Sequence, residues 1–591
     1  RVSFQTSGLG AQYDNTLISV LYFDLQTANS ERFQNLVTAS ATEFGLAFDT
    51  PIGKKIKVTS SIRRSYLDLL FQVIDLPFLP EYFDVATKVD WQINPRTKLT
   101  YLHIGAWDNF KRNFPDDPDL ETQATIDALP SIVQRTFTQG FNLKRSTRQG
   151  ALSVALSRNF LFNTVERLKP LTDPAERLLD YESFEAETKL RINGIETRGP
   201  WEFRYGGVAQ FAQFYVDSRG SVIIPVQQAD GSYTGVEELI RQDDRLDFWR
   251  WGLHASVSRR FRRFRSTLGL RTDGNSFTDT GNDLLATLSP RLSLSYALSE
   301  RWTANASVGT YYKLPSYTVL GYAPDGERVN SGAQYIESTH YVAGLEYKPA
   351  DDWLLSLEGF YKAYTDYPVS LRSGLSLANL GGDFSVFGNE PIQSVGKGRA
   401  YGVEFFAQKL LTDKLYGIFA YTLYWSEFTG IDTATGRPND RYIRSAWDNR
   451  HLVTLTGGYR FGRNKSWEVS ARLRALGPAP FTPWNIELSR ETYPITGEGQ
   501  LDWGRLNTSE TDWFSTLDIR IDKRWFFPKW SLNLFLDIQN ATNNPNSGPP
   551  TFTLRRTSRT TFATGSDNWT LIDNAGASIL PSIGVRIKFG Y

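Results

Sequence analysis

The feature that most limits the fold of this chain is a two-residue alternation between apolar and polar side chains. In "STLDIRIDKRW" at 515–525, leucine and isoleucine occupy one face of an extended strand, whereas aspartate and arginine occupy the other. The stretches "WSLNLFLDIQN" at 530–540 and "PSIGVRIKFGY" at 581–591 repeat the pattern. Rows of charges without partners are too costly to bury in a dry core, so the polar face must contact water or a polar filling.

The connections between these alternating segments are of two kinds, very short and long. The short ones occur at 94–98, 146–150, 197–201, 349–353, 411–414, 462–466 and 527–530. Long polar or aromatic stretches occur between them, at about 67–80, 112–133, 167–180, 218–243, 316–334, 371–396, 430–450, 478–511 and 544–579. Short turns at one end and long loops at the other are typical of outer-membrane barrels, whose turns are periplasmic and whose loops are extracellular.

Composition excludes several other classes of protein. A membrane-spanning helix needs about 20 apolar residues in a row, and the most apolar stretch, "YLDLLFQVIDLPFLP" at 66–80, is interrupted by charged residues and proline. The 591 residues include no cysteine, which excludes disulfides and thiol catalysis. A net charge of +1 gives no support for a nucleic-acid partner.

We therefore predict an all-β fold, a membrane-spanning antiparallel β-barrel of about 22 strands with short periplasmic turns and long extracellular loops. The barrel is expected to occupy residues 31–591 and to be closed by the C-terminal strand, with Ile583 and Val585 towards lipid. Tryptophans at strand ends, such as Trp353 and Trp467, fit the aromatic belt of a membrane interface. The expected location is the outer membrane of a Gram-negative bacterium, where lipid and lipopolysaccharide surround the barrel.

Residues 1–30 precede the first barrel strand and do not fit a spanning hairpin. They contain a run with glycines, then "AQYD" at 11–14 and a candidate strand at 18–25. Together with "KLPSYTVLGY" at 313–322 and "LFLDIQNATN" at 534–543, this order of motifs resembles that of TonB-dependent outer-membrane transporters. The resemblance covers essentially the whole chain, and it implies that residues 1–30 are the C-terminal remnant of a plug domain.

The resemblance also implies a function. A transporter of this family imports a scarce nutrient, such as a metal chelate, an oligosaccharide or a peptide, and is driven by TonB with its inner-membrane energising complex. Most of the plug and the TonB-binding segment are expected upstream of residue 1. A surface lipoprotein is a further candidate partner, and no cofactor is implied.

Two alternatives stay open at the level of sequence. The barrel could be a scaffold or subunit of an outer-membrane surface assembly that transports nothing, or it could be a passive pore. A TonB-binding segment in the gene product favours transport, whereas a barrel without a plug favours a pore. Enzymatic activity is not predicted, because no serine has an activating context and paired acids such as Asp243–Asp244 belong to solvated stretches.

The long loops carry the candidate substrate site. Tyr311, Tyr312, Tyr317, Trp484 and Trp503 are predicted to form an aromatic platform for a sugar, a peptide or a siderophore. Aromatic residues at loop bases also serve as membrane-interface anchors, so the prediction concerns the location of the site rather than its chemistry.

The polar faces of the last strands carry the candidate plug-contact site. Charged rows there are expected to line the lumen and to hold the plug through solvated ion pairs. The predicted residues are Arg472, Arg474, Asp518, Arg520, Asp522 and Arg524. Recognition of substrate is the alternative role for the same residues.

Two further groups of residues have ordinary explanations. The four histidines, His103, His254, His340 and His451, show no ligand spacing, and we predict no metal site. The basic stretch "SRRFRRFR" at 258–265 is predicted to span a periplasmic turn, where arginines reach lipid headgroups or the lumen rather than nucleic acid.

Overall fold

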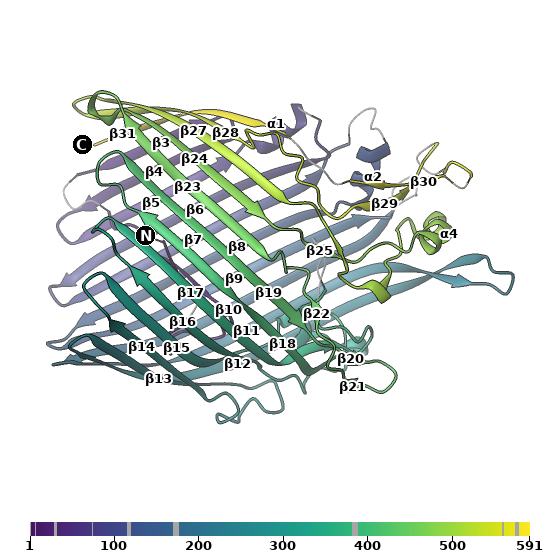
Figure 1. Cartoon of the computed structure of the whole chain (residues 1–591), viewed down its shortest axis with the longest axis horizontal. Helices are drawn as coiled ribbons and strands as arrows, with labels where there is room; N and C mark the ends of the chain where they lie inside the picture. The colour runs from purple at the N-terminus through teal and green to yellow at the C-terminus, as the bar shows by residue number, and fades with distance from the viewer. Residues whose placement is uncertain are drawn as a thin grey trace.

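The main body of the protein is one closed antiparallel β-barrel of 22 strands, in which each strand pairs with the next along the chain. The computed structural model describes residues 2–5, 8–28, 32–73, 75–114, 120–169, 176–380, 388–557, 561–565, 567–573 and 578–590. The last strand pairs with the first, so the sheet has no free edge. Figure 1 shows the strands tilted across the barrel, with short turns at one end and long loops at the other.

The barrel strands are β3 (Gln34–Ser40), β4 (Glu43–Ile52), β5 (Ile56–Ser65), β6 (Phe78–Asn94), β7 (Thr97–Arg112), β8 (Ser131–Ser146), β9 (Gly150–Leu168), β10 (Arg177–Arg198), β11 (Trp201–Gln227), β12 (Tyr233–Phe261), β13 (Phe264–Asn275), β14 (Ser289–Ala297), β15 (Trp302–Lys313), β16 (Ile336–Tyr347), β17 (Trp353–Ser370), β18 (Ile392–Lys409), β19 (Leu415–Phe428), β23 (His451–Phe461), β24 (Trp467–Leu476), β27 (Phe514–Phe526), β28 (Trp530–Gln539) and β31 (Leu580–Phe589).

The alternation in the sequence places apolar side chains on the outer face of the barrel. Leu253 of β12 exposes 60% of its surface, whereas the next residue, His254, exposes 8%. The prediction for the closing strand is confirmed, because β31 pairs with β28 and β3, and Ile583 exposes 59% while Ser582 exposes 6%. Tyr591 lies outside the described residues.

The predicted sorting of connections is confirmed. Strands β6 and β7 are joined at 95–96 and strands β12 and β13 at 262–263, on the same end of the barrel. The opposite end carries long connections such as 314–335 and 477–513. The prediction of a long loop at 218–243 is wrong, because β11 and β12 continue as a paired hairpin that projects beyond the other connections (Figure 1).

Smaller elements lie in the long connections and before the barrel. They are β1 (Val2–Gln5), β2 (Val20–Phe23), β20 (Ile431–Asp432), β21 (Arg437–Pro438), β22 (Ile443–Arg444), β25 (Pro480–Phe481), β26 (Ser509–Glu510), β29 (Thr551–Leu554), β30 (Trp569–Ile572), α1 (Leu67–Val73), α2 (Leu120–Ala128), α3 (Tyr317–Gly321), α4 (Ile486–Thr496) and the short 3₁₀ turns η1 (Pro324–Gly326), η2 (Arg463–Lys465) and η3 (Trp503–Arg505). Among the described residues, no helix is both long enough and apolar enough to cross a membrane.

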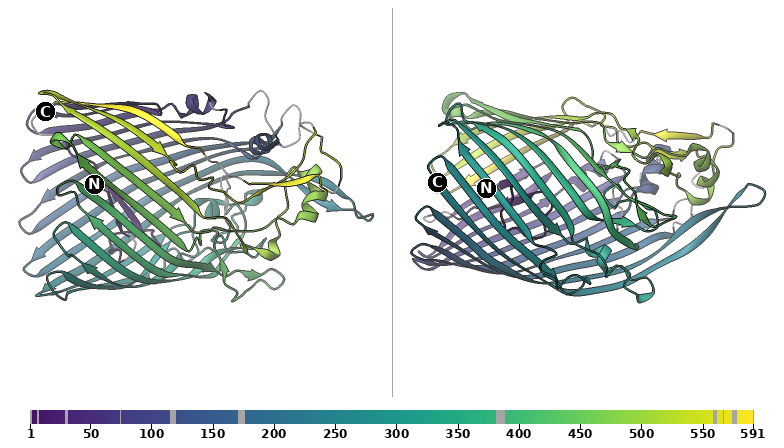
Figure 2. Two further views of the ribbon diagram at one scale, coloured as in Figure 1. Left: turned by 45° about the horizontal axis from the view of Figure 1, so that its top comes forward. Right: turned by 60° about the horizontal axis from the view of Figure 1, so that its bottom comes forward.

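Of the chain before β3, the described residues 2–5 and 8–28 lie inside the barrel rather than in its wall. Strands β1 and β2 form a two-stranded sheet of their own, separate from the barrel sheet. Figure 2 shows this part, in purple, enclosed by the barrel strands. The strand expected at 18–25 is present as β2, which is shorter than expected.

Candidate functional site

Residues 8–28, which we call the lumen segment, pack against the inner side of the barrel wall. Leu9 and Ala11 are almost completely buried, with 1% and 2% of their surfaces exposed. Ala11 lies against Gly269 of β13, where a Cβ atom would come within 3.1 Å of the Ala11 side chain. The glycine therefore permits the close approach of the lumen segment to the wall.

Three arginines from three strands hold the lumen segment, and we call them the arginine triad: Arg191 of β10, Arg271 of β13 and Arg291 of β14. Arg291 makes the largest number of these contacts. Its Nη1 atom donates hydrogen bonds to the carbonyl oxygen of Gly10 at 2.6 Å and to that of Leu9 at 3.3 Å. Such hydrogen bonds from a charged donor are stronger than those between neutral groups.

The carbonyl groups that Arg291 contacts are available because the lumen segment turns at this point. The Tyr13 amide donates to the Gly10 carbonyl at 3.2 Å, and Gly8 adopts a φ of +60°. A turn leaves carbonyl groups without strand partners, and a buried carbonyl needs a donor from elsewhere. The Tyr13 carbonyl also accepts from Arg291, at 3.4 Å.

The other two arginines complete the contact. Arg271 Nη1 donates to the carbonyl oxygen of Ala11 at 3.2 Å, and Arg191 forms an ion pair of 2.7 Å with Asp14. Burial raises the pKa of the Asp14 carboxyl, but the cations of Lys189, Arg191 and Arg271 outweigh this effect and hold the pKa well below its ordinary value. Asp14 is therefore ionised wherever the protein is folded near neutral pH.

A second group of contacts fixes the end of the lumen segment on β6. Lys88 Nζ donates to the carbonyl oxygen of Leu25 at 2.7 Å. The Thr27 hydroxyl donates to the Asp90 carboxylate at 2.9 Å. The lumen segment thus crosses the interior from the wall formed by β13 and β14 to the wall formed by β6.

The connection between β15 and β16 folds back into the barrel above the lumen segment. Its Leu314 amide donates to the Asn15 side chain of the lumen segment at 3.0 Å. The Tyr317 hydroxyl in α3 donates to Glu187 of β10 at 2.6 Å. Burial, together with the nearby Glu187 carboxylate, raises the pKa of Tyr317, so this hydroxyl keeps its proton.

Apolar packing fixes the same connection against the wall. Val319 and Leu320 of α3 are buried against Phe214 of β11 and Leu246 and Phe248 of β12. Gly321 lies so close to the wall that an added Cβ would come within 2.6 Å of the Phe214 ring. The loop end of the barrel is therefore partly filled by its own connections.

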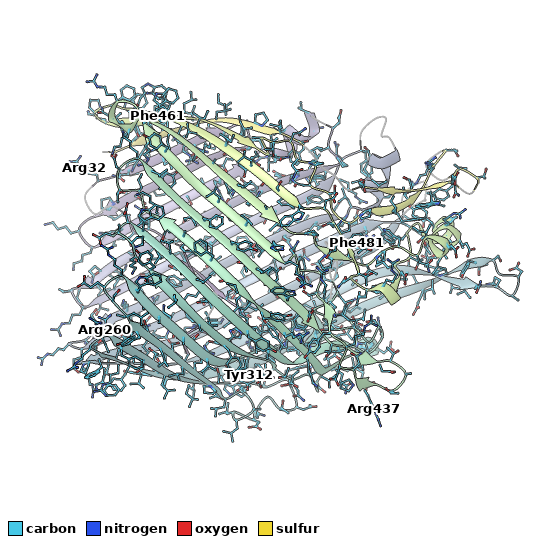
Figure 3. The ribbon with its side chains drawn as sticks, viewed as in Figure 1. Arg32, Arg260, Tyr312, Arg437, Phe461 and Phe481 are labelled. Atoms are coloured by element: carbon cyan, nitrogen blue, oxygen red, sulfur yellow. The ribbon has the colours of Figure 1, made fainter. Side chains whose placement is uncertain are left out.

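The long connections also form an open depression, which we call the tryptophan pocket. It has a volume of about 550 Å³. Its lining consists of Asn379, Leu380, Ala446, Trp447, Ala479, Pro480, Phe481, Thr482, Trp484, Leu501, Trp503, Leu506, Asn507, Pro549, Pro550 and Thr551. Trp447 and Trp503 are more than half exposed. Figure 3 labels Phe481 on this side of the molecule.

The structure divides the five aromatic residues predicted for the substrate site into two groups. Trp484 and Trp503 line the tryptophan pocket together. Tyr311 instead lies against His340 inside the barrel, with tilted rings whose centroids are 4.5 Å apart, and the Arg291 guanidinium lies over its ring. Tyr312 donates to Glu337 at 3.1 Å, and Tyr317 lies in α3.

The charged residues predicted for plug contact pair with acids on their own part of the wall. Arg472 forms an ion pair with Asp518 at 2.6 Å, and Arg520 forms one with Asp522 at 2.9 Å. Arg524 pairs with Glu468 at 3.0 Å. Arg474 lies on the same face of β24 as Arg472. The polar contacts from barrel strands to the lumen segment described above come from the arginine triad and from Lys88 and Asp90 of β6, which the sequence did not single out.

Groups of three or more metal-ligating side chains were not found in the part of the chain that the structure describes. His254 contacts Asn193 at 3.1 Å, and His340 contacts Ser338 at 2.9 Å. His451 contacts the Tyr421 hydroxyl at 3.0 Å. These three histidines therefore take part in hydrogen bonds within the wall.

A closed barrel of 22 strands, with sorted turns and loops and a chain segment held in its lumen, is the architecture of a plugged outer-membrane transporter. The sequence matches the family described as "TonB dependent receptor-like, beta-barrel" over residues 81–541, and the chain belongs to this family. It is therefore a protein of the outer membrane of a Gram-negative bacterium. The members of this family are transporters and receptors rather than enzymes.

Solved structures share the fold at low sequence identity. The ferripyoverdine receptor of the outer membrane of Pseudomonas aeruginosa is 12% identical with a TM-score of 0.66, over 98% of this chain and 74% of that one. The siderophore receptor PiuA from Acinetobacter baumannii is 13% identical with a TM-score of 0.64, over 98% and 84%. The copper transporter OprC is 12% identical with a TM-score of 0.64, over 100% and 85%. No curated protein sequence matches the chain.

Proposed function

We propose that the protein imports a scarce nutrient across the outer membrane, driven by TonB and its inner-membrane energising complex. Residues 1–30 then form the C-terminal end of its plug domain, and residues 31–591 form the barrel. The observation that carries the proposal is the docking of the lumen segment on the arginine triad. A chain segment fixed across the lumen by buried charged contacts obstructs free diffusion, which disfavours a passive pore.

The substrate class follows from the tryptophan pocket. Its lining combines three indole rings with the largely buried side-chain amides of Asn379 and Asn507, and among the described residues no charged side chain lines it. Aromatic rings bind the flat faces of other rings through stacking, and amides supply directional hydrogen bonds. We propose a neutral ligand that contains rings, with a metal chelate as the first candidate, in line with the siderophore and ferripyoverdine receptors that share the fold.

The test of transport uses the full-length gene product in outer membranes of two strains, one with a functional TonB and one without. Labelled ferric chelates and labelled oligosaccharides are offered to both strains. We expect accumulation of a chelate only where TonB functions. Equal accumulation in both strains would indicate a passive pore, and accumulation in neither, with a co-purifying surface protein, would indicate a scaffold.

The test of the ligand site compares Trp503→Ala with Trp353→Ala. Trp503 lines the tryptophan pocket, whereas Trp353 begins β17 at the opposite end of the barrel. We expect ligand binding to weaken about tenfold in the first variant only, since an aromatic contact contributes about 1 kcal/mol beyond its buried area. Equal affinities of the two variants for the imported chelate would show that the ligand does not bind in the tryptophan pocket.

We further propose that the rest of the plug contacts the charged face of β24 and β27. That face presents Arg472, Arg474, Asp518, Arg520, Asp522 and Arg524 towards the lumen. The Arg472 side chain remains 49% exposed although it pairs with Asp518. A partly exposed and charged wall of this kind can exchange hydrogen bonds with an additional polar surface without the cost of burying unpaired charge.

A further inference from the structure

The short turns that follow β10 and β12, together with the adjoining strand ends, line one depression of about 570 Å³ that contains four arginines. We call these residues the arginine rim, and they are Arg259, Arg260, Arg262 and Arg265. Figure 3 labels Arg260 at the end of the barrel that carries the short turns. This end faces the periplasm in outer-membrane barrels.

The charges of the arginine rim lack acidic partners within the described residues. Glu202 also lines the depression, but it forms its ion pair with Arg204 at 2.8 Å. Arg260 lies directly opposite Arg265 in the pairing of β12 with β13. Like charges in opposite positions destabilise a sheet, so a bound anion would relieve this repulsion.

Aromatic rings place the arginine rim at the membrane interface. The guanidinium carbon of Arg259 lies 4.7 Å from the centroid of the Trp201 ring, and that of Arg262 lies 5.5 Å from the Phe261 ring. Trp201 and Phe261 are exposed on the outer surface. Exposed tryptophan and phenylalanine at strand ends mark the level of the lipid headgroups.

A separate apolar groove lies further along the lipid-facing side of the same strands. It has a volume of about 700 Å³, and Leu190, Tyr205, Leu253 and Leu270 line it as exposed side chains. Its floor contains Gly207, which has no side chain and pairs with Leu253 of β12. The groove exists because a small residue stands where neighbouring strands carry large ones.

The distance between the arginine rim and the groove fits one lipid molecule. Ala255 in the groove and Arg259 in the arginine rim are four residues apart on the outer face of β12. At a rise of about 3.3 Å per residue, this separation is about 13 Å. One leaflet contributes about half of a hydrocarbon core of about 30 Å, so the groove lies within the acyl-chain region of the nearer leaflet.

We propose that this face of β10 to β13 binds one anionic glycerophospholipid of the periplasmic leaflet. The phosphate accepts hydrogen bonds from Arg259 and Arg262, since guanidinium groups bind phosphate oxygens in a bidentate manner. Arg260 and Arg265 add positive charge to the same depression. One acyl chain occupies the groove over Gly207. Arg259 and the groove lie on the outer surface of the barrel, apart from the transport path through the lumen.

The experiment measures lipid retention by the full-length protein in nanodiscs of phosphatidylcholine that contain a small fraction of phosphatidylglycerol. Native mass spectrometry counts the phosphatidylglycerol that stays bound after release from the disc. The test variant is Arg259→Gln with Arg262→Gln. The control is Lys54→Gln with Lys55→Gln, which removes the same charge from the exposed turn between β4 and β5.

We expect the test variant to bind phosphatidylglycerol about 25-fold more weakly, since each basic residue near an anionic surface contributes about fivefold. The control should retain wild-type binding. Equal losses in both variants, or no loss in either, would overturn the proposal, because binding would then not depend on this site. Heat-modifiable migration on gels confirms that each variant is a folded barrel.

A second variant tests the acyl-chain part of the site without changing charge. Ala255→Phe fills the groove with an apolar side chain on a surface that already faces lipid. We expect the preference for phosphatidylglycerol to fall while the arginine rim is intact. Unchanged retention in Ala255→Phe would show that the groove does not hold an acyl chain of the bound lipid, which would overturn the proposal.

Discussion

Two parts of the lumen wall both carry arginines, but the arginines of the two parts have different partners. On β10, β13 and β14, the arginine triad donates to the lumen segment. On β24 and β27, arginines pair with acids of the same wall. The cross-strand neighbour explains the difference for Arg291, which lies opposite Gly309, whereas Arg472 lies opposite Asp518. Arg271 forms an ion pair with Asp273 of its own strand in addition to its hydrogen bond to the lumen segment. An arginine without an acid across the strand is available to another part of the chain.

The largest expected effect comes from Arg291→Leu, which removes the donor to the carbonyls of Leu9, Gly10 and Tyr13. We expect the docking of the lumen segment to weaken by about 3 kcal/mol, since buried carbonyl groups lose a charged donor. Amide hydrogen exchange of residues 8–14 in the full-length protein measures the effect. Wild-type protection in this variant would show that the arginine triad does not hold the segment.

Asp14→Asn is expected to have a smaller effect, about 2 kcal/mol, because it removes the ion pair with Arg191 and leaves the contacts to the backbone. The pH dependence gives a separate measurement. Because the pKa of Asp14 is lowered in the folded state, its contribution is complete above about pH 4 and is lost only as the pH falls through the lowered value.

Hydrogen exchange of the lumen segment should therefore change little between pH 7 and pH 4, after correction for the intrinsic exchange rate. The Asp14→Asn variant should lack any transition below that range. A loss of protection in the wild type near pH 6 would contradict the assignment, since the responsible group would then be a histidine.

Tyr317→Phe tests whether the connection 314–335 belongs to the same structural unit as the lumen segment. The change removes a hydrogen bond to Glu187, and we expect a loss of about 1 kcal/mol. Proteolysis of the 314–335 connection should become faster, whereas the exchange of residues 8–14 should change less. Faster exchange in both regions by the same factor would show that they open together.

The smallest effect is expected for Arg472→Gln. Its side chain is 49% exposed, and ion pairs of that kind contribute less than about 1 kcal/mol. The melting temperature of the full-length protein should shift only slightly, and the lumen segment should keep its protection. Loss of hydrogen-exchange protection in the lumen segment would show that the wall of β24 and β27 also holds this segment.

The barrel could be predicted from the sequence because strands and turns are both signalled by residues that lie close together in the chain. Alternation over ten residues defines the two faces of a strand, and Gly, Asn and Pro mark the turns, so the strand number and the closing strand β31 were predicted correctly. The hairpin at 218–243 was missed because its strands continue beyond the other connections, where apolar residues such as Val222 and Leu239 are exposed among polar ones. Alternation there no longer signals a lipid face.

The arginine triad could not be predicted, because the partners of Arg271 and Arg291 are main-chain carbonyls about 260 and 281 residues away in the chain. No sequence pattern identifies an unpaired carbonyl group. Trp484 and Trp503, which the sequence proposed for the substrate site, line one pocket together with Trp447, which the sequence did not single out. Tyr311 was grouped with the loops although it stands on a barrel strand and faces Arg291.

Because Arg271 and Arg291 bind main-chain oxygens, their hold on the lumen segment does not depend on which side chains residues 9, 10, 11 and 13 carry. The side chains at these positions can therefore be substituted while the arginines of the barrel wall are kept. The limit is the contact of Ala11 with Gly269, where an added Cβ at residue 269 would come within 3.1 Å of the Ala11 side chain. Grafting the corresponding stretch of a relative into this barrel should succeed wherever that relative has a small residue in place of Ala11.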